Sequence, residues 1–374
     1  MTRTTERIDL LGLPPDDART ALEAHYAGRG VASYRALQTL DRLYGKVVLS
    51  FDEITELPRI EREALAGSFD LVAPAAARVQ VSGDGTAKHL WRLADGELVE
   101  SVLIPTADRL TLCLSSQAGC AMACVFCATG WSGYRRNLGA GEIVAQYRGA
   151  RRWAEENGRG AITNIVYMGM GEPLMNRAAV LDSLTVLNHA YDVGARRITV
   201  STVGIVPGIV ELARRPEQFR LAVSLHAPTH ELRRKIVPVE KKYPLPQLLD
   251  ALRAFEAAGG RRITFEYVMI DGINDDLALT DALAEIAGEF RAHVNLIPFN
   301  PVPGTGWSPS PERRLREFAR RLEAAGVNAT VRESRGRDIA AACGQLAAEH
   351  EMKPPKPFVE LIAGRSSGSG APRA

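Results

Sequence analysis

The segment GCAMACVFCATG, residues 119–130, carries three cysteines at the spacing CxxxCxxC: Cys120, Cys124 and Cys127. Thiolates are the soft ligands that hold zinc or iron–sulfur clusters. A structural zinc site needs four protein ligands, whereas this loop offers three and Cys113 falls inside the preceding predicted strand. A [4Fe–4S] cluster held by three cysteines leaves one iron free to bind a ligand. The loop therefore predicts an open cluster, with zinc as the weaker alternative.

The residues around this loop alternate between strand and helix patterns, which is typical of βαβ units and a parallel sheet. We expect helices over 141–156 and 177–191, a final helix over 311–325 and a strand over 328–333. The main strands are expected at 109–114, 164–168, 197–201, 221–225, 263–269 and 293–297. Six such strands predict an α/β fold with a full or partial barrel.

Polar side chains fall at or directly after the ends of these strands. They are Glu172, Ser201, Ser224, His226 and Asn300. In a parallel barrel the strand ends meet on one face, where side chains from distant parts of the chain converge on one ligand. Turn formation alone would explain Gly and Pro at these places, but not this set of polar residues. The pattern predicts a single ligand site at that face.

The rest of the chain divides into accessory parts. Residues 1–75 are expected to form a small helical domain, 76–108 a short β connector, 109–350 the barrel core with a C-terminal cysteine segment, and 351–374 a tail that is disordered at its end. No apolar run approaches membrane-spanning length, and residues 1–9 lack the apolar core of a signal peptide. We expect a cytoplasmic protein without a membrane partner.

Composition sets only broad limits. The 374 residues are 46% hydrophobic and 24% charged, with a formal net charge of +2, as in an ordinary globular protein. This weak charge does not by itself indicate a nucleic-acid-binding protein. The five cysteines, three of them within eight residues, do not suggest a secreted disulfide framework.

The cysteine loop resembles the signature of the radical S-adenosylmethionine (SAM) superfamily, because an aromatic residue, Phe126, precedes the last cysteine. The run GMGEP, residues 169–173, resembles that superfamily's loop after the second strand. The resemblance implies that the open iron binds the amino and carboxylate groups of SAM and that an electron cleaves SAM to a 5′-deoxyadenosyl radical. It also places Glu172 against the methionine ammonium group, a sensible charge pairing.

Nearly end to end, the chain is similar to the RlmN family of dual-specificity adenine-C2 methyltransferases of 23S rRNA and tRNA. The matching segments are TLCLSSQAGC (111–120), RNL (136–138), YMGMGEPLMN (167–176), STVGIVP (201–207), VSLHA (223–227), NLIPFNP (295–301) and RDIAAACGQL (337–346). The resemblance implies that SAM is bound by Gly171, Glu172, Ser201, Ser224, Leu225, His226 and Asn300. Considered singly, such residues are more often caps, turn residues or buried hydrogen-bonded groups.

The resemblance also gives roles to the two remaining cysteines, which by local sequence alone would be read as small apolar residues. One SAM methylates Cys343, and a second supplies the radical that removes a hydrogen from the S-methyl group. The carbon radical adds to adenine C2, and Cys113 then attacks the sulfur of Cys343, forming a disulfide that releases the methylated base. Glu100 matches the family's proposed proton acceptor.

The implied partners are 23S rRNA, specifically its peptidyl-transferase centre, tRNA at adenosine 37, and an external electron donor such as a flavodoxin-type reductant. The target adenine must be unpaired or flipped out. We expect residues 1–75 to recognise RNA shape and Arg135 and Arg136 to hold phosphates. Val239-Glu240 stands where related sequences have Ile-Asn, and Tyr134 where Phe is more frequent; we interpret both as neutral drift.

Two alternatives remain open at this point. A Cfr-like enzyme shares the cluster and both cysteines but methylates adenine C8. A non-catalytic iron–sulfur or zinc protein would bind RNA without chemistry.

Overall fold

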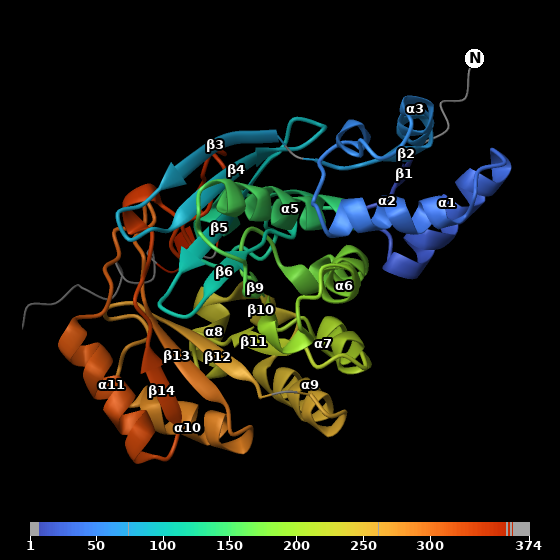
Figure 1. Ribbon diagram of the computed structural model, residues 1–374. Helices are drawn as coiled ribbons and strands as arrows, with labels where there is room; N and C mark the ends of the chain where they lie inside the picture. The colour runs from blue at the N-terminus through green and yellow to red at the C-terminus, as the bar shows by residue number, and fades with distance from the viewer. Residues whose placement is uncertain (1–6, 74, 261, 357, 360, 362–374) are drawn as a thin grey trace, which may run out of the picture.

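One ten-stranded sheet forms the centre of the molecule, in the order β14-β13-β12-β11-β10-β9-β6-β5-β4-β3 (Figure 1). The computed structural model describes residues 7–73, 75–260, 262–356, 358–359 and 361. The end of the tail, residues 362–374, for which disorder is expected, lies outside the described residues. The sheet has a parallel part and an antiparallel part, which meet between β6 and β5.

The parallel part contains the predicted strands. Every neighbouring pair in it is parallel. Its strands are β6 (Leu110–Cys113), β9 (Asn164–Tyr167), β10 (Ile198–Thr202), β11 (Arg220–Ser224), β12 (Thr264–Met269), β13 (His293–Pro298) and β14 (Asn328–Val331). Each strand lies beside the next one along the chain, and the series does not close on itself. The predicted α/β fold with a partial barrel is confirmed.

Helices connect these strands and cover the sheet. They are α5 (Ala140–Glu156), α6 (Arg177–Thr185), α7 (Val206–Ala213), α8 (His230–Ile236), α9 (Leu245–Ala257), α10 (Leu279–Glu289) and α11 (Glu312–Ala324). Figure 1 shows α6, α7 and α9 following one another around the outer side of the sheet. In α11 the buried residues Leu315, Phe318 and Leu322 recur every three or four positions, so one stripe of the helix faces the core.

The antiparallel part consists of β3 (Ala75–Val81), β4 (Ala87–Arg92) and β5 (Leu98–Pro105), which we call the β3–β5 layer. Here the structure differs from the simple connector expected over 76–108, because β5 pairs with β6 and these strands extend the sheet. Gly85 (φ 85°) and Gly96 (φ 89°) lie in the turns that join β3 to β4 and β4 to β5, where the left-handed conformation favours glycine.

The N-terminal helices have an apolar core of their own. They are α1 (Pro15–Gly28), α2 (Tyr34–Tyr44), the 3₁₀ turn η1 (Phe51–Glu53) and α3 (Arg59–Ser68). Arg148 of α5, fully buried, donates to the carbonyl oxygens of Leu43 (2.5 Å) and Val48 and to the hydroxyl of Tyr191 (2.6 Å). These hydrogen bonds join the N-terminal helices to the rest of the molecule.

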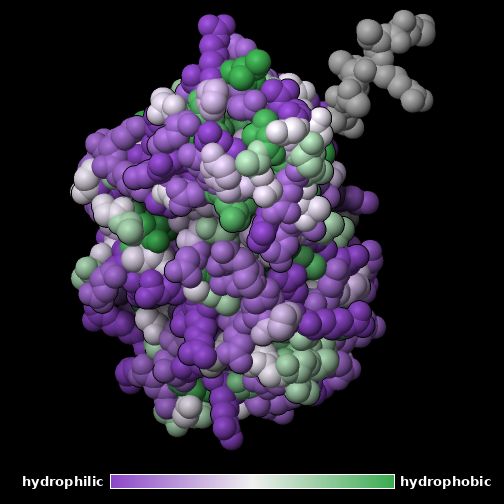
Figure 2. Space-filling model, turned by 45° about the vertical axis from the view of Figure 1, so that its right-hand side comes forward, coloured by the Kyte–Doolittle hydropathy of each residue, from purple (hydrophilic) through white to green (hydrophobic). Residues whose placement is uncertain are grey.

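The remaining elements are short. They are β1 (Ile8–Asp9) with β2 (Phe69–Asp70), β7 (Gln117–Gly119) with β8 (Tyr134–Asn137), α4 (Ala128–Trp131), and the turns η2 (Pro173–Met175), η3 (Val186–Ala190), η4 (Ala195–Arg197), η5 (Pro238–Lys241) and η6 (Arg337–Ile339). In the part of the chain that the structure describes, no helix has both the length and the apolar character needed to cross a bilayer. On the face drawn in Figure 2, hydrophilic residues predominate and apolar residues are scattered.

Candidate active site

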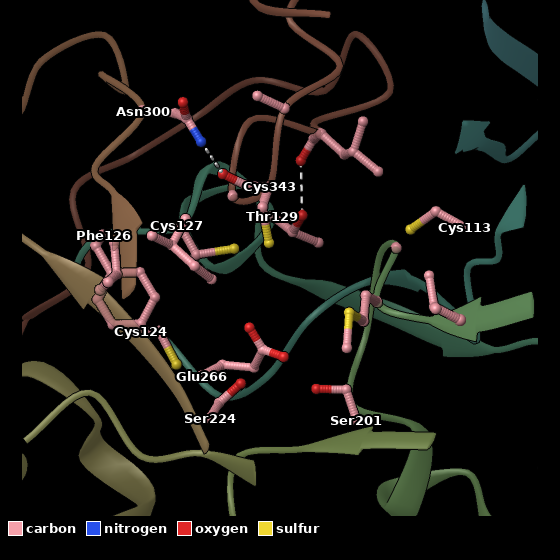
Figure 3. Close-up of a pocket in the computed structure, with 18 of the residues that line it drawn as sticks. Cys113, Cys124, Phe126, Cys127, Thr129, Ser201, Ser224, Glu266, Asn300 and Cys343 are labelled. Carbon is pink, nitrogen blue, oxygen red and sulfur yellow. Dashed lines mark hydrogen bonds between the residues drawn. The ribbon is translucent and has the colours of Figure 1, made fainter. Parts of the chain in front are cut away.

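The ends of the parallel strands surround a cavity of about 460 Å³. Figure 3 shows the polar side chains and thiols that converge on it from separate strands and loops. All the residues predicted for the site line this cavity except Leu225 and Glu100. Those that line it are Cys113, Cys120, Cys124, Cys127, Gly171, Glu172, Ser201, Ser224, His226, Asn300 and Cys343.

The cysteine loop is held in shape by its own backbone and by the β7–β8 hairpin. The amide of Cys127 donates to the carbonyl of Cys124 (3.2 Å), and that of Cys120 donates to the carbonyl of Gly133 (2.8 Å). Gly119 has φ 72°, and a side chain there would collide with the same Gly133 carbonyl, so the position requires glycine. The three cysteines of this loop all line the cavity.

The donor set fits an iron–sulfur cluster. Burial raises the pKa of the Cys120 and Cys124 thiols well above the usual range. The thiolate form that binds metal therefore needs positive charge beside it, which iron ions provide. Among the described residues, no group of three or more His, Cys, Asp or Glu side chains is gathered closely enough to hold a single metal ion.

Glu172 follows β9 in a turn that only glycine permits. Gly171 has φ 101°, and a Cβ there would lie 2.6 Å from the Cβ of Gln117. The two carboxylate oxygens of Glu172 accept hydrogen bonds from the amides of Leu174 (3.0 Å) and Val203 (2.8 Å). Burial nevertheless raises the pKa of Glu172 to about 7. A ligand ammonium group placed against it would keep the carboxylate ionised.

His226 lines the cavity in a fixed, neutral form. Its backbone has φ 58°, its Nδ1 accepts a hydrogen bond from the amide of Val268 (3.0 Å), and its ring meets that of Phe126 edge-on at 4.6 Å. Burial lowers the pKa of His226 to about 3, so the ring stays uncharged. Leu225 is fully buried, and only its backbone is available to organise the strand end.

Asn300 connects the end of β13 to the segment that bears Cys343. Its side-chain amide donates to the carbonyl oxygen of Cys343 (3.0 Å), as Figure 3 shows, and its Oδ1 accepts from Arg337 (2.9 Å). In this structure both of its polar atoms are therefore used within the protein.

Cys343 and Cys113 lie on the same cavity as free thiols. Cys343 is accessible to solvent, whereas Cys113, at the end of β6, is buried, and Figure 3 shows its sulfur pointing into the cavity. Burial raises the pKa of Cys113 to about 12, with a smaller contribution from the nearby Cys343 thiolate. Burial of its sulfur raises the pKa of Cys343 to about 11, although the residue as a whole is exposed, and Arg332 lowers the pKa of both thiols. The two sulfurs thus share one electrostatic environment.

Glu100 is buried away from the cavity lining. Its Oε1 forms an ion pair with Lys88 (2.9 Å), and its Oε2 accepts hydrogen bonds from the amides of Ala347 and Ala348 (3.0 Å each). Both oxygens therefore have partners within the protein.

Sequence reasoning missed Glu266 of β12, which lines the cavity between Ser224 and Asn295 of the neighbouring strands. Its Oε1 accepts from the amide of Asn295 (3.0 Å), but its buried Oε2 has no hydrogen-bond partner. Burial raises the pKa of Glu266, and Arg332 opposes that shift. A lone carboxylate within the apolar run TFEYVM was the signal that could have revealed it.

The interpretation of Glu240 as neutral drift is wrong. Glu240 is fully buried and forms an ion pair with the fully buried Arg233. Arg233 in turn donates to the carbonyl oxygens of Val203 (2.5 Å) and Leu225 (3.1 Å), which follow β10 and β11. Glu240 therefore supports two of the strand ends that form the site.

The guanidinium groups of Arg135 and Arg136 already have carboxylate partners. Arg136 contacts Asp95 (2.5 Å) and Glu142 (2.7 Å), and Arg135 contacts Glu97 (3.4 Å). Phosphate binding by this pair remains a prediction, and it would compete with these ion pairs.

Comparison with known proteins places the chain among radical SAM methyltransferases. The Radical SAM superfamily model matches residues 114–284. The probable dual-specificity RNA methyltransferase RlmN of Gemmatimonas aurantiaca is 52% identical over 91% of this chain and 93% of that protein. The dual-specificity RNA methyltransferase RlmN of Halorhodospira halophila is 46% identical over 93% and 95%. The crystal structure of a radical SAM methyltransferase from Sphaerobacter thermophilus covers 91% of this chain and all of that one, with 46% identity and a TM-score of 0.87.

Proposed function

Because this chain belongs to the RlmN family of radical SAM RNA methyltransferases, we propose that it methylates C2 of adenosine in 23S rRNA and of adenosine 37 in tRNA. One observation carries the proposal: Cys343 and Cys113, far apart in sequence, line the same cavity as the three-cysteine loop. A passive iron–sulfur protein has no need of two further thiols at that place.

The enzyme uses a [4Fe–4S] cluster and SAM, which together supply the methyl group and the radical. We assign Cys120, Cys124 and Cys127 to the cluster. For SAM we assign the carboxylate of Glu172, the turn at Gly171, the hydroxyls of Ser201 and Ser224, the segment Leu225–His226, and Asn300. The buried, half-titrated carboxylate of Glu172 suits an ammonium group, and the neutral His226 adds no competing charge.

In this proposal Cys343 carries the methyl group, and its accessible thiol suits that task. Once its methyl carbon is bonded to the base, the thiolate of Cys113 attacks the Cys343 sulfur. One sulfur–sulfur bond forms while the sulfur–carbon bond breaks, and the electron pair of the latter stays with the carbon, which takes up a proton to become the methyl group of the product. The raised pKa of Cys113 means that it must first lose its proton, and Arg332 favours the thiolate. A proton-accepting role for Glu100 remains a prediction of the resemblance.

The proposed partners are 23S rRNA, tRNA and an external one-electron donor of the flavodoxin type, and the proposed location is the cytoplasm. The N-terminal helices are the proposed RNA-recognition unit, since they form a separate apolar core joined to the barrel by Arg148.

Nucleoside mass spectrometry of rRNA and tRNA from a deletion strain tests the proposal. Loss of 2-methyladenosine that returns with the wild-type gene is expected, whereas loss of 8-methyladenosine would establish the C8 alternative. Anaerobic protein that produces 5′-deoxyadenosine from SAM on reduction is also expected; a protein that binds RNA but leaves SAM intact would contradict any radical activity.

A further inference from the structure

The Cys343 segment, residues 336–350, lies between the active site and the β3–β5 layer. On its inner side, Thr129 donates to the carbonyl of Leu346 (2.6 Å) and Asn300 to that of Cys343 (3.0 Å), both drawn in Figure 3. Its other side meets β4 and β5 through Lys88 and Glu100. The Cys343 segment is therefore held on one side by α4 and the loop after β13 and on the other side by the β3–β5 layer.

Lys88 and Glu100 hold the segment on both flanks of Cys343. The ammonium group of Lys88 donates to the carbonyl of Ala340 (3.3 Å), three residues before the cysteine. One carboxylate oxygen of Glu100 accepts from the amides of Ala347 and Ala348 (3.0 Å each), which lie just after it. The second carboxylate oxygen contacts Lys88 (2.9 Å), so one buried pair connects both ends of the loop.

The backbone at these contact points is strained. Ala340 has φ 50° and Ala348 has φ 49°, values in the left-handed region that residues with a side chain rarely adopt. Such conformations persist only where the surroundings hold them. The groups that hold these two alanines are the charged ends of Lys88 and Glu100.

Burial gives the pair its strength. The side chains of Lys88 and Glu100 are 8% and 3% exposed. A charged group shielded from water makes strong hydrogen bonds, but it is costly when it lacks partners. Lys88 and Glu100 therefore each hold the backbone of the Cys343 segment, and they also hold each other in position.

We infer that the Lys88–Glu100 pair positions Cys343 opposite Cys113, and that Glu100 acts through the loop rather than by touching the RNA base. The inference rests on the proposed function, which gives the position of Cys343 relative to Cys113 its catalytic importance. That position can be measured without RNA or SAM turnover. The proton-accepting role is the competing assignment for Glu100.

The proximity of the two sulfurs can be measured as the rate at which they form a disulfide. Anaerobic holoenzyme prepared with Cys343 unmethylated, as mass spectrometry verifies, is treated with diamide, which takes up the two electrons and two protons that the thiols release, and the Cys113–Cys343 peptide is quantified by mass spectrometry. The variants are Glu100→Gln and the double replacement Lys88→Met with Glu100→Met, which leaves no unpaired buried charge. Both are expected to slow the reaction at least about tenfold while iron content stays at the wild-type level.

Arg78→Met is the matched control, because Arg78 forms an ion pair with Glu349 between the same layer and the same segment, but with both side chains 48% exposed. Exposed pairs contribute little, so its disulfide rate should stay within about twofold of wild type. Alkylation of Cys343 by iodoacetamide in each protein shows that the thiol itself remains reactive.

Two results would overturn the inference. One is an unchanged disulfide rate in both pair variants. The other is a Glu100→Gln enzyme that keeps the wild-type disulfide rate in its unmethylated form and becomes fully methylated at Cys343 when SAM is supplied, yet accumulates a covalent RNA adduct, because that result assigns Glu100 to the base. The first result does not depend on the carrier role of Cys343: if Cys343→Ala enzyme still methylated RNA, the proposed function would fail while the disulfide rates of the other proteins would still report the placement.

Discussion

The two parts of the sheet contribute to the site in different ways. The parallel strands present ligand-facing groups at their ends, in short motifs such as the cysteine loop and GMGEP. The β3–β5 layer carries no such motif. One side of β4 holds Lys88, which reaches the Cys343 segment, while on the other side His89 stacks on Trp91 (5.1 Å) and meets Trp153 of α5 edge-on (5.0 Å).

The difference shows that one part of a sheet can carry the reactive groups while another part positions them. The strand ends of the parallel part supply the proposed SAM-binding groups and Cys113, one of the two proposed reactive thiols. The β3–β5 layer packs against α5 on one face and binds the Cys343 segment on the other face. Changes in the first part should therefore abolish steps of the reaction, whereas changes in the second should alter stability and positioning.

The largest expected effect is that of Cys343→Ala. Removing the proposed methyl carrier should reduce RNA methylation at least about a thousandfold, since no other group replaces a missing nucleophile. Iron content and SAM binding should remain normal, because the cluster ligands lie on another loop. Incorporation of labelled methyl groups into RNA measures the effect, and methylation near the wild-type level would rule out the carrier role.

Lys88→Met should have the next largest effect, on stability. It leaves the buried Glu100 carboxylate without its counter-charge, which costs about 3–5 kcal/mol. The double variant with Glu100→Met should recover a large part of this loss. Urea midpoints compare the three proteins; a single variant as stable as wild type would show that the pair is not buried in solution.

The buried His89 of the β3–β5 layer predicts that the free energy of unfolding depends on pH. Burial lowers its pKa to about 4 from an ordinary value of 6.5. The unfolded chain therefore binds the proton more readily, and between pH 6.5 and 4 stability should fall by about 1.4 kcal/mol for each unit of acidification. His89→Phe should lack this component, because it cannot be protonated. The difference in unfolding free energy between the two proteins at pH 7.5 and 5.5 isolates it; equal slopes would contradict a buried neutral ring.

The strands of the parallel part, and the motif residues that line its cavity, could be predicted from sequence because that information is local. A strand followed within a few positions by cysteines, Gly-Glu-Pro or Ser-Leu-His can be recognised without knowing what lies opposite. The function of Lys88 could not be predicted, since its partners at residues 100 and 340 are distant in sequence and a lysine in a strand normally faces water. Glu240 was misinterpreted for the same reason. Its role depends on the ion pair with Arg233, and the local sequence does not indicate that Arg233 is buried.

Glu266 gives the smallest expected effect in the comparison of the parallel part with the β3–β5 layer. It lies in the parallel part but belongs to none of the recognised motifs. Glu266 lines the cavity, its buried Oε2 has no hydrogen-bond partner, and its carboxylate affects the pKa of Cys343. We expect that oxygen to accept a hydrogen bond from a bound ligand, which for a charged acceptor contributes about 1.5–3 kcal/mol. Glu266→Gln keeps the shape of the side chain and one acceptor for Asn295, so RNA methylation should fall about tenfold to a hundredfold with normal iron content.

The matched control is Glu333→Gln, since Glu333 lines the same cavity with its side chain 88% exposed, and it should change activity less than about twofold. Equal effects of the two replacements would mean that the cavity responds to net charge rather than to the Glu266 oxygen.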